Sequence, residues 1–222
     1  GRINLFWLLV ISFFPGLLWV YFFYRKDKYD PEPIGLVLKT FLYGIIAVFP
    51  AVLFEKPFAG LIAKPPNLVT LLLLTIFVIG LVEEVMKYLV VRYTVYKSNE
   101  FDEVVDGIIY MVSAGLGFAA FENLLYSSVL GFKVGLMRAF ITSLVHASFS
   151  GIVGYYLGRA KLESKPNLVY FGLVQVVILH GLYDFLVMGE LISASTVVVI
   201  VFILYFYLAR LIKKALATSV YR

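Results

Sequence analysis

The sequence predicts an all-α protein, a polytopic transmembrane helical bundle of about seven spans with a buried polar cavity. Hydrophobic residues make up 62% of the 222 residues, charged residues make up only 15%, and the mean hydropathy is +0.94. A water-soluble domain of this size needs far more polar surface, so lipid must be the solvent for most of the chain. Polar and ionisable residues inside several of the apolar stretches predict the cavity.

Seven apolar stretches account for nearly the whole chain, and each has about 20 residues or more, which is enough to cross a bilayer as a helix. They are Ile3–Tyr24, Ile34–Phe54, Leu68–Val91, Gly107–Leu130, Val134–Leu157, Leu168–Met188 and Leu191–Leu211. The first stretch is long, aromatic-rich and without a small-residue cleavage site, so we expect a span rather than a cleavable signal peptide. No separate soluble domain is left over, and residues 1–222 are expected to form a single integral membrane domain.

The basic residues predict the orientation, because cytoplasmic loops carry an excess of Lys and Arg. One side has 12: Arg25, Lys26, Lys28, Arg92, Lys97, Arg159, Lys161, Lys165, Arg210, Lys213, Lys214 and Arg222. The other side has 5: Arg2, Lys56, Lys64, Lys133 and Arg138. We therefore expect a multi-pass protein of the plasma membrane with an outside N-terminus and a cytoplasmic C-terminus. The net charge of +5 needs no nucleic-acid partner.

Two further patterns concern packing and the loops. Small residues spaced three or four apart in the fourth and fifth spans allow close helix contact in lipid, so these spans should lie in the centre of the bundle. The seventh span has no polar residue in its middle and is expected at the periphery. The acidic connector Ser98–Asp106 is interpreted as a solvated segment with helix-start acids, in preference to a metal site.

The informative exceptions are ionisable groups at membrane depth, each of which costs about 2.5–3.5 kcal/mol at a helix centre. They lie on four consecutive spans, and they include both histidines of the chain. The set is Glu83, Glu84, Lys87, Glu122, Asn123, His146, His180 and Asp184. Four helices can lower this cost by turning such groups toward one another around a wet cavity, and a functional site is therefore favoured over a network that only joins helices.

Helical spacing refines the interpretation. Glu83 and Lys87 are four residues apart and share a face, so Lys87 can neutralise Glu83. His180 and Asp184 have the same spacing, which lets the carboxylate orient the imidazole. Glu84 lies about 100° around the helix from Glu83, so one of the pair can face the cavity while the other serves a neighbouring helix.

Two chemistries fit these residues. In the first, Glu83 is a general base acting on water, and His180 or His146 polarises the scissile carbonyl or protonates the leaving amine. In the second, His146, His180 and Glu122 bind a metal ion such as Zn²⁺, with Glu83 as the base. The chain has no His-Glu-x-x-His helix and therefore no compact zinc motif. It also has no cysteine, which excludes a cysteine nucleophile and thiolate ligands, and a serine nucleophile is disfavoured.

At these residues the chain resembles the PrsW family of membrane-embedded proteases, related to the CAAX prenyl endopeptidases and the bacterial Abi (CPBP) group. The resemblance covers nearly the whole chain and rests on several short motifs in order. They are Asp30-Pro31-Glu32-Pro33, Glu83-Glu84-Val85-Met86-Lys87, Asp106-Gly107-Ile108-Ile109-Tyr110, Phe118-Ala119-Ala120-Phe121-Glu122-Asn123, His146, and His180-Gly181-Leu182-Tyr183-Asp184.

The resemblance implies a protease that makes the first cleavage of a single-span, membrane-anchored anti-sigma factor in regulated intramembrane proteolysis, a stress response. It also implies that Glu83, Glu84 and His180 are essential. Glu122 stands where the CAAX endopeptidases have a histidine, and Asp184 where many have asparagine. This departure leaves the metal question open, and it makes prenylated substrates a less favoured alternative.

From the residues alone, Asp184 orients His180, and His146 and Glu122 complete the site as transition-state stabilisers or as metal ligands. The rival functions are a proton- or cation-coupled transporter and a non-catalytic scaffold with a polar core. One geometric tension is visible. Glu83 lies about 22 Å along its span from the outer end at helical rise, whereas Glu122, His180 and Asp184 lie nearer the outer ends of theirs. A single site then requires a shifted or tilted third span, or a deep water-filled funnel.

Overall fold

The computed structural model describes residues 4–222, and in that range it contains helices and no strand. Arg2 and the expected first residue of the first span, Ile3, lie outside the described residues. The helices are α1 (Leu5–Tyr24), α2 (Ile34–Glu55), the 3₁₀ turn η1 (Lys56–Phe58), α3 (Ala59–Ala63), α4 (Leu68–Leu74), the π-helical segment η2 (Thr75–Gly80), α5 (Leu81–Thr94), α6 (Val104–Leu130), α7 (Phe132–Leu162), α8 (Asn167–Met188) and α9 (Ala194–Ala217).

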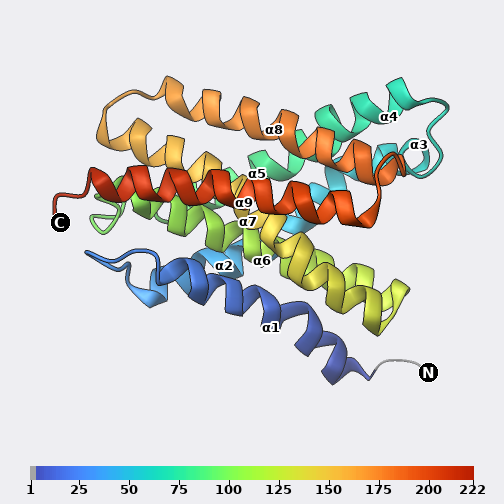
Figure 1. Cartoon of the computed structure of the whole chain (residues 1–222), viewed down its shortest axis with the longest axis horizontal. Coiled ribbons are helices and arrows are strands. Elements are labelled where there is room, and N and C mark those ends of the chain that lie inside the picture. The colour runs from blue at the N-terminus through green and yellow to red at the C-terminus, as the bar shows by residue number, and fades with distance from the viewer. Residues whose placement is uncertain (1–3) are drawn as a thin grey trace.

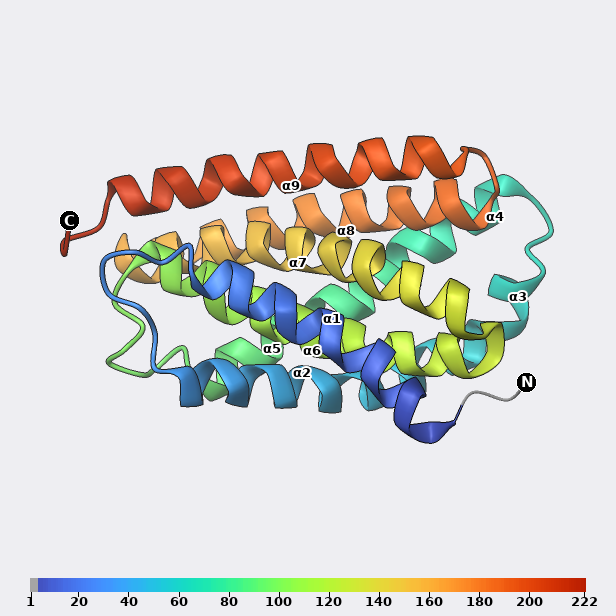
Figure 2. The same ribbon diagram turned by 60° about the horizontal axis from the view of Figure 1, so that its bottom comes forward.

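Seven helical segments in residues 4–222 are long and apolar enough to cross a membrane, as the sequence predicts. They run side by side as one bundle (Figures 1 and 2). One end of the bundle holds the C-terminus together with the loops that join α1 to α2 and α5 to α6 (Figure 2). We call it the C-terminal end. The opposite end holds the α3 segment, the start of α1 and the α8–α9 loop.

Helix α6 is the centre of the bundle, and nearly every residue in its first two thirds is buried. It packs against α1, α2 and α7, and α7 in turn supports α8 and α9. Glycines allow the closest approaches: a Cβ added at Gly154 of α7 would collide with the Gly107 carbonyl oxygen on α6. The expected central place of the fourth and fifth spans is confirmed, because small residues let these two backbones touch.

Helix α9 lies on the outside of the bundle, as expected from the absence of polar residues in the middle of the seventh span (Figure 2). Its outward side chains, such as Phe202, Ile203 and Phe206, are exposed and suited to lipid. The helix begins at Ala194, three residues later than expected, because the Ser193 side chain accepts a hydrogen bond from the Thr196 amide and caps it there.

The third span is not a regular α-helix. Its middle, Thr75–Gly80, is π-helical, and the α-helix resumes at Leu81, just before Glu83 and Glu84. This segment packs tightly on α8: a Cβ added at Gly181 would lie 2.5 Å from the Ile76 Cα. A π-helical turn changes the rotational phase of the residues after it and is frequent at functional sites. It sets the direction in which the two glutamates leave the helix.

The acidic connector is only partly as predicted. Asp106 does lie in the first turn of α6 and accepts hydrogen bonds from the amides of Asp102 (2.9 Å) and Glu103 (2.6 Å). The expectation of a solvated segment is wrong for Glu103 and Asp106, which are buried. The reason is the α1–α2 loop, which folds over the start of α6 and brings Asp27 and Glu32 to the same place.

These loop acids are strongly affected by their surroundings. Burial and the nearby Glu103 carboxylate raise the pKa of Asp27 to about 6. Burial and the charge of Asp106 raise the pKa of Glu32 to about 10. Both pKa values rise for the same reason: burial away from a cation makes the charged form of a carboxyl group unfavourable.

We predict that Gly154→Ala destabilises the bundle, because the added methyl would meet Gly107 backbone atoms that cannot rotate away. Overpacking of this kind costs about 1–3 kcal/mol. Gly35→Ala is the matched control, since no atom lies within 4 Å of a Cβ added there. Thermal unfolding in detergent should show a lower Tm for Gly154→Ala and an unchanged or higher Tm for Gly35→Ala. Equal Tm values for both variants would contradict the tight α6–α7 contact.

Candidate active site

The centre of the site is Lys87, whose ammonium is completely buried on α5. Its Nζ donates to Glu84 Oε1 at 2.9 Å and to Glu83 Oε2 at 3.4 Å, one turn earlier on the same helix. It also lies 2.8 Å from His146 Nδ1 on α7 and 4.6 Å from the centre of the Phe118 ring. The expected Glu83–Lys87 pair is therefore present, and Lys87 additionally joins α5 to α7.

His180 on α8 is held between carboxylates. Its Nδ1 lies 2.7 Å from Glu84 Oε1, and its Nε2 lies 3.3 Å from Asp184 Oδ2 and 3.8 Å from Glu83 Oε2. Phe149 stacks on the ring with a centroid separation of 5.0 Å. The predicted His180–Asp184 contact exists, and Glu84 supplies a second orienting carboxylate that helical spacing alone could not reveal.

His146 and Glu122 form the third part of the site. His146 Nε2 lies 2.9 Å from Glu122 Oε2 on α6. A lysine ammonium has donors only, so with Lys87 charged the imidazole accepts at Nδ1, and the neutral ring carries its proton on Nε2. Asn123, next to Glu122, has a structural role, because its Nδ2 donates to Ser143 Oγ at 3.1 Å and joins α6 to α7.

All six predicted site residues therefore come together, from four helices. Five of them border one cavity of about 710 Å³: Glu83, Glu122, His146, His180 and Asp184. Glu84 is fully buried behind them. The cavity extends to Lys56, Ala63 and Pro65, in the α2–α4 connection at the end opposite the C-terminus. One cavity thus joins Glu83 to this end of the bundle.

Three cavity residues do not stand out in the sequence. Glu55 lies just beyond the predicted second span, and Arg138 has a signal only as one of the basic residues outside the membrane. Both border the cavity, as does Tyr126, whose ring centre lies 3.8 Å from the Arg138 guanidinium carbon. The sequence gives little reason to select these residues, because charged and aromatic residues are common near the ends of membrane spans. Their place beside Glu83 is visible only in the folded structure.

The donor set of the site can be tested for a metal ion. Glu83, Glu122 and His146 each offer one ligand atom, and these atoms all lie within 4.8 Å of one another. Two carboxylates and an imidazole are ligand types that Zn²⁺ accepts, and the adjoining cavity leaves room for water. The residues therefore fit a metal. The expected set of His146, His180 and Glu122 is not the one that converges, because Glu83 takes the place of His180.

Comparison with known proteins decides the family. A sequence model described as "PrsW family intramembrane metalloprotease" matches residues 32–209, which include all six site residues. The chain belongs to the PrsW family. It is accordingly a multi-pass membrane enzyme that hydrolyses peptide bonds and acts on a protein substrate.

Curated members of the PrsW family are similar over most of their length. "Protease PrsW" of Geobacillus kaustophilus (strain HTA426) is 38% identical over 180 residues, covering 79% of this chain and 77% of that protein. "Protease PrsW" of Halalkalibacterium halodurans is 38% identical over 184 residues, covering 81% and 83%. "Protease PrsW" of Bacillus subtilis (strain 168) is 36% identical over 176 residues, covering 78% of each chain. No solved structure was found to match the chain.

We predict that Lys87→Met strongly destabilises the protein, because it leaves Glu83, Glu84 and His146 buried without their shared partner. Breaking a buried ion pair by removing one member costs about 3–5 kcal/mol. The double variant Lys87→Met/Glu84→Gln should recover part of this loss, since it also removes one unpaired charge. Denaturant unfolding in mixed micelles gives the free energy of unfolding of each variant. A Lys87→Met protein as stable as the wild type would show that Lys87 does not neutralise the cluster.

Proposed function

We propose that residues 1–222 act as a single intramembrane protease domain that makes the first, site-1 cleavage of a membrane-anchored anti-sigma factor. The observation that carries the proposal is the position of Glu83. It lies beside His180 and Lys87 at the inner end of a cavity of about 710 Å³ that reaches the opposite end of the bundle from the C-terminus. The PrsW motifs support a substrate with one membrane span.

The orientation is part of the proposal. The excess of basic residues at the C-terminal end favours a cytoplasmic C-terminus in the plasma membrane. The end of the cavity at Lys56, Ala63 and Pro65 then faces outward. The cavity would then be reached from the outer side of the membrane, the side on which the first cleavage is expected.

Glu83 is the proposed general base. It borders the cavity, so it can accept a proton from a water molecule that attacks the scissile carbonyl. His180 also borders the cavity and is oriented by Glu84 and Asp184, so it is the proposed acid for the leaving amine. Glu84, fully buried and out of the cavity, acts through His180 and Lys87 as a positioning residue.

Glu122 and His146 are the proposed holders of a metal ion together with Glu83, which would then be a ligand in place of its role as free base; zinc is the first candidate. A metal bound there would polarise the scissile carbonyl and activate water. His146 and the two carboxylates would hold the ion only in their unprotonated forms, so the amount of zinc retained should rise with the pH. In the absence of metal, His146 and Glu122 can still stabilise developing charge beside the substrate.

The substrate needs access as an extended segment, because the carbonyl groups of a helix are already hydrogen-bonded. A second hollow of about 400 Å³ between α2 and α6 shares Val52, Glu55, Glu83, Glu122 and Tyr126 with the main cavity. Its remaining walls are apolar and include Val48, Leu125 and Val129. We propose that the unwound substrate enters from the membrane between these two helices.

We predict that Glu83→Gln and His180→Ala each reduce cleavage of a co-reconstituted single-span anti-sigma-like substrate by about 100-fold to 10,000-fold, the range expected when a general base or acid is lost. Glu163→Gln is the matched control, because Glu163 lies at the far end of α7, where it pairs with Arg159 and Lys165. Product formation is measured by mass spectrometry on variants first shown to be folded. A folded Glu83→Gln protein that cleaves at the wild-type rate would contradict the assignment.

The same assay, run with and without a chelator, tests whether cleavage requires a metal ion. Cleavage should stop in chelator and return with added Zn²⁺, while Glu122→Gln and His146→Ala should lower the amount of zinc retained. Chelator-resistant cleavage that still requires Glu83 would favour carboxylate chemistry without a metal.

We predict that Val52→Trp lowers cleavage by about 10-fold or more by filling the proposed entrance, which corresponds to a barrier of about 1.4 kcal/mol. The neighbouring substitution Leu53→Trp is the control: both side chains are exposed on α2, but Val52 borders the two hollows and Leu53 borders neither. The ratio of the two cleavage rates is the readout. Equal rates would argue against entry between α2 and α6.

A further inference from the structure

A second acidic cluster lies far from Glu83, at the C-terminal end of the bundle. It consists of Asp27 and Glu32 from the α1–α2 loop and Asp106 from the first turn of α6. One carboxylate oxygen of each residue lies within 4.8 Å of those of the other two. The three residues are only 4%, 3% and 0% exposed. Three carboxyl groups are therefore gathered where water cannot screen their charges.

No basic side chain in residues 4–222 forms an ion pair with any of the three; the ion pairs found there involve other acids. Lys161 of α7 is directed elsewhere, to the carbonyl oxygens of Ser98 (3.1 Å) and Phe101 (2.5 Å). The cluster differs in this respect from the active site, where Lys87 supplies the compensating charge.

Hydrogen bonds satisfy only part of the cluster. Asp106 Oδ2 accepts the amides of Asp102 and Glu103, and Glu32 Oε2 accepts the Tyr110 hydroxyl. Asp106 Oδ1 and both oxygens of Asp27 are buried without a hydrogen-bond partner. A buried carboxylate with unused lone pairs is costly unless it is paired or coordinates a metal. The oxygens without a partner are therefore free to bind a metal ion, and every candidate ligand atom in the cluster is a carboxylate oxygen.

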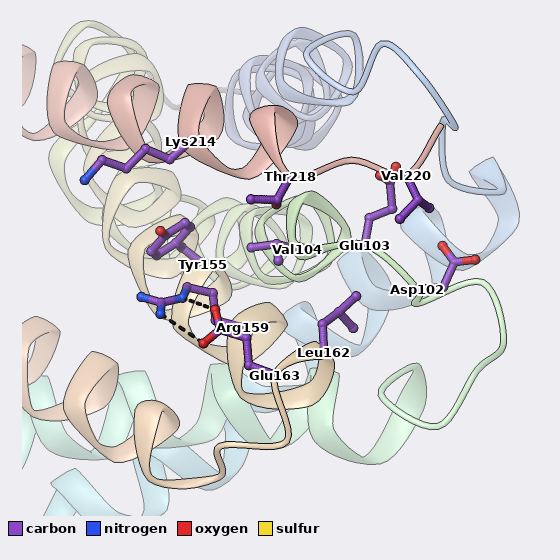
Figure 3. Close-up of a pocket in the computed structure, with 10 residues that line it drawn as sticks. All are labelled: Asp102, Glu103, Val104, Tyr155, Arg159, Leu162, Glu163, Lys214, Thr218 and Val220. Carbon is purple, nitrogen blue, oxygen red and sulfur yellow. Dashed lines mark hydrogen bonds and ion pairs between the residues drawn. The ribbon is translucent and has the colours of Figure 1, made fainter. Parts of the chain in front are cut away.

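We propose that Asp27, Glu32 and Asp106 bind a hard divalent cation, Mg²⁺ or Ca²⁺, separate from the catalytic centre. Both ions prefer carboxylate and carbonyl oxygens, and the cluster contains neither histidine nor any softer donor. Glu103, the capping residue of α6, borders a neighbouring surface pocket of about 200 Å³ that none of the three carboxylates lines (Figure 3).

The bound ion would have a structural effect. It would tie the α1–α2 loop to the first turn of α6, the helix on which the other spans pack. A ligand that binds only the folded state stabilises it, and the effect grows with the logarithm of the free ligand concentration above the Kd, so the bundle should become more stable with the ion. The active-site geometry at the other end need not change.

The test is thermal unfolding of the full chain in detergent, first stripped with chelator and then titrated separately with Mg²⁺ and Ca²⁺. The wild type should gain several degrees in Tm with at least one ion. Asp27→Asn should lose this gain, and it should be more stable than the wild type in chelator because one unpaired buried charge is removed. Asp30→Asn, in the same loop but exposed, should behave as the wild type.

A Glu122→Gln variant separates this site from the catalytic one, because it weakens the proposed zinc set and leaves the loop cluster intact. It should keep the full ion-dependent gain in Tm. If Asp27→Asn does not fold, direct titration calorimetry of Glu122→Gln should still show one bound divalent ion. No gain in Tm with either ion, or the same gain in Asp27→Asn as in the wild type, would overturn the proposal.

Discussion

The buried ammonium of Lys87 is the interaction on which the rest of the site depends. Two adjacent glutamates lie near the start of α5, and at membrane depth their charges need a partner within reach. Lys87 satisfies both and also contacts His146, so one side chain joins α5 to α7. Glu84 then reaches His180 and adds α8. The polar network is consequently a constraint on how the helices pack as well as a source of chemistry.

Close packing makes this network possible. Glycines at the α6–α7 and η2–α8 contacts bring backbones together, and the polar side chains of four helices can then reach one another. Proteolysis also requires water, which a fully packed core would exclude. The cavity meets that need on one side of Glu83, while Glu84 and Lys87 stay in the dry part of the bundle. Residues on the cavity side of the site can therefore reach water and substrate, while the buried residues behind them hold the reacting side chains in position.

Much of this organisation could be predicted from the sequence, because lipid imposes simple rules. Apolar length indicates the seven spans, small-residue spacing indicates the central helices, and the cost of intramembrane charge singles out Glu83, Glu84, Glu122, His146, His180 and Asp184. The predicted contact between Glu83 and Lys87 along one helix is also present. Contacts between helices far apart in sequence could not be predicted, such as Glu84 with His180 or Asp27 with Asp106. The π-helical turn before Glu83 was missed for a related reason, since it is stabilised by packing against Gly181.

The most direct test of the central account is to map where the scissile bond of a bound substrate lies. A photo-crosslinking residue placed at that bond in a single-span substrate, mixed with the catalytically impaired Glu83→Gln protein, should attach to walls of the cavity such as Val52, Tyr126 or Tyr183. Mass spectrometry identifies the attachment point. Crosslinks confined to the C-terminal end or to the outer face of α9 would contradict a peptide-cleaving site around Glu83.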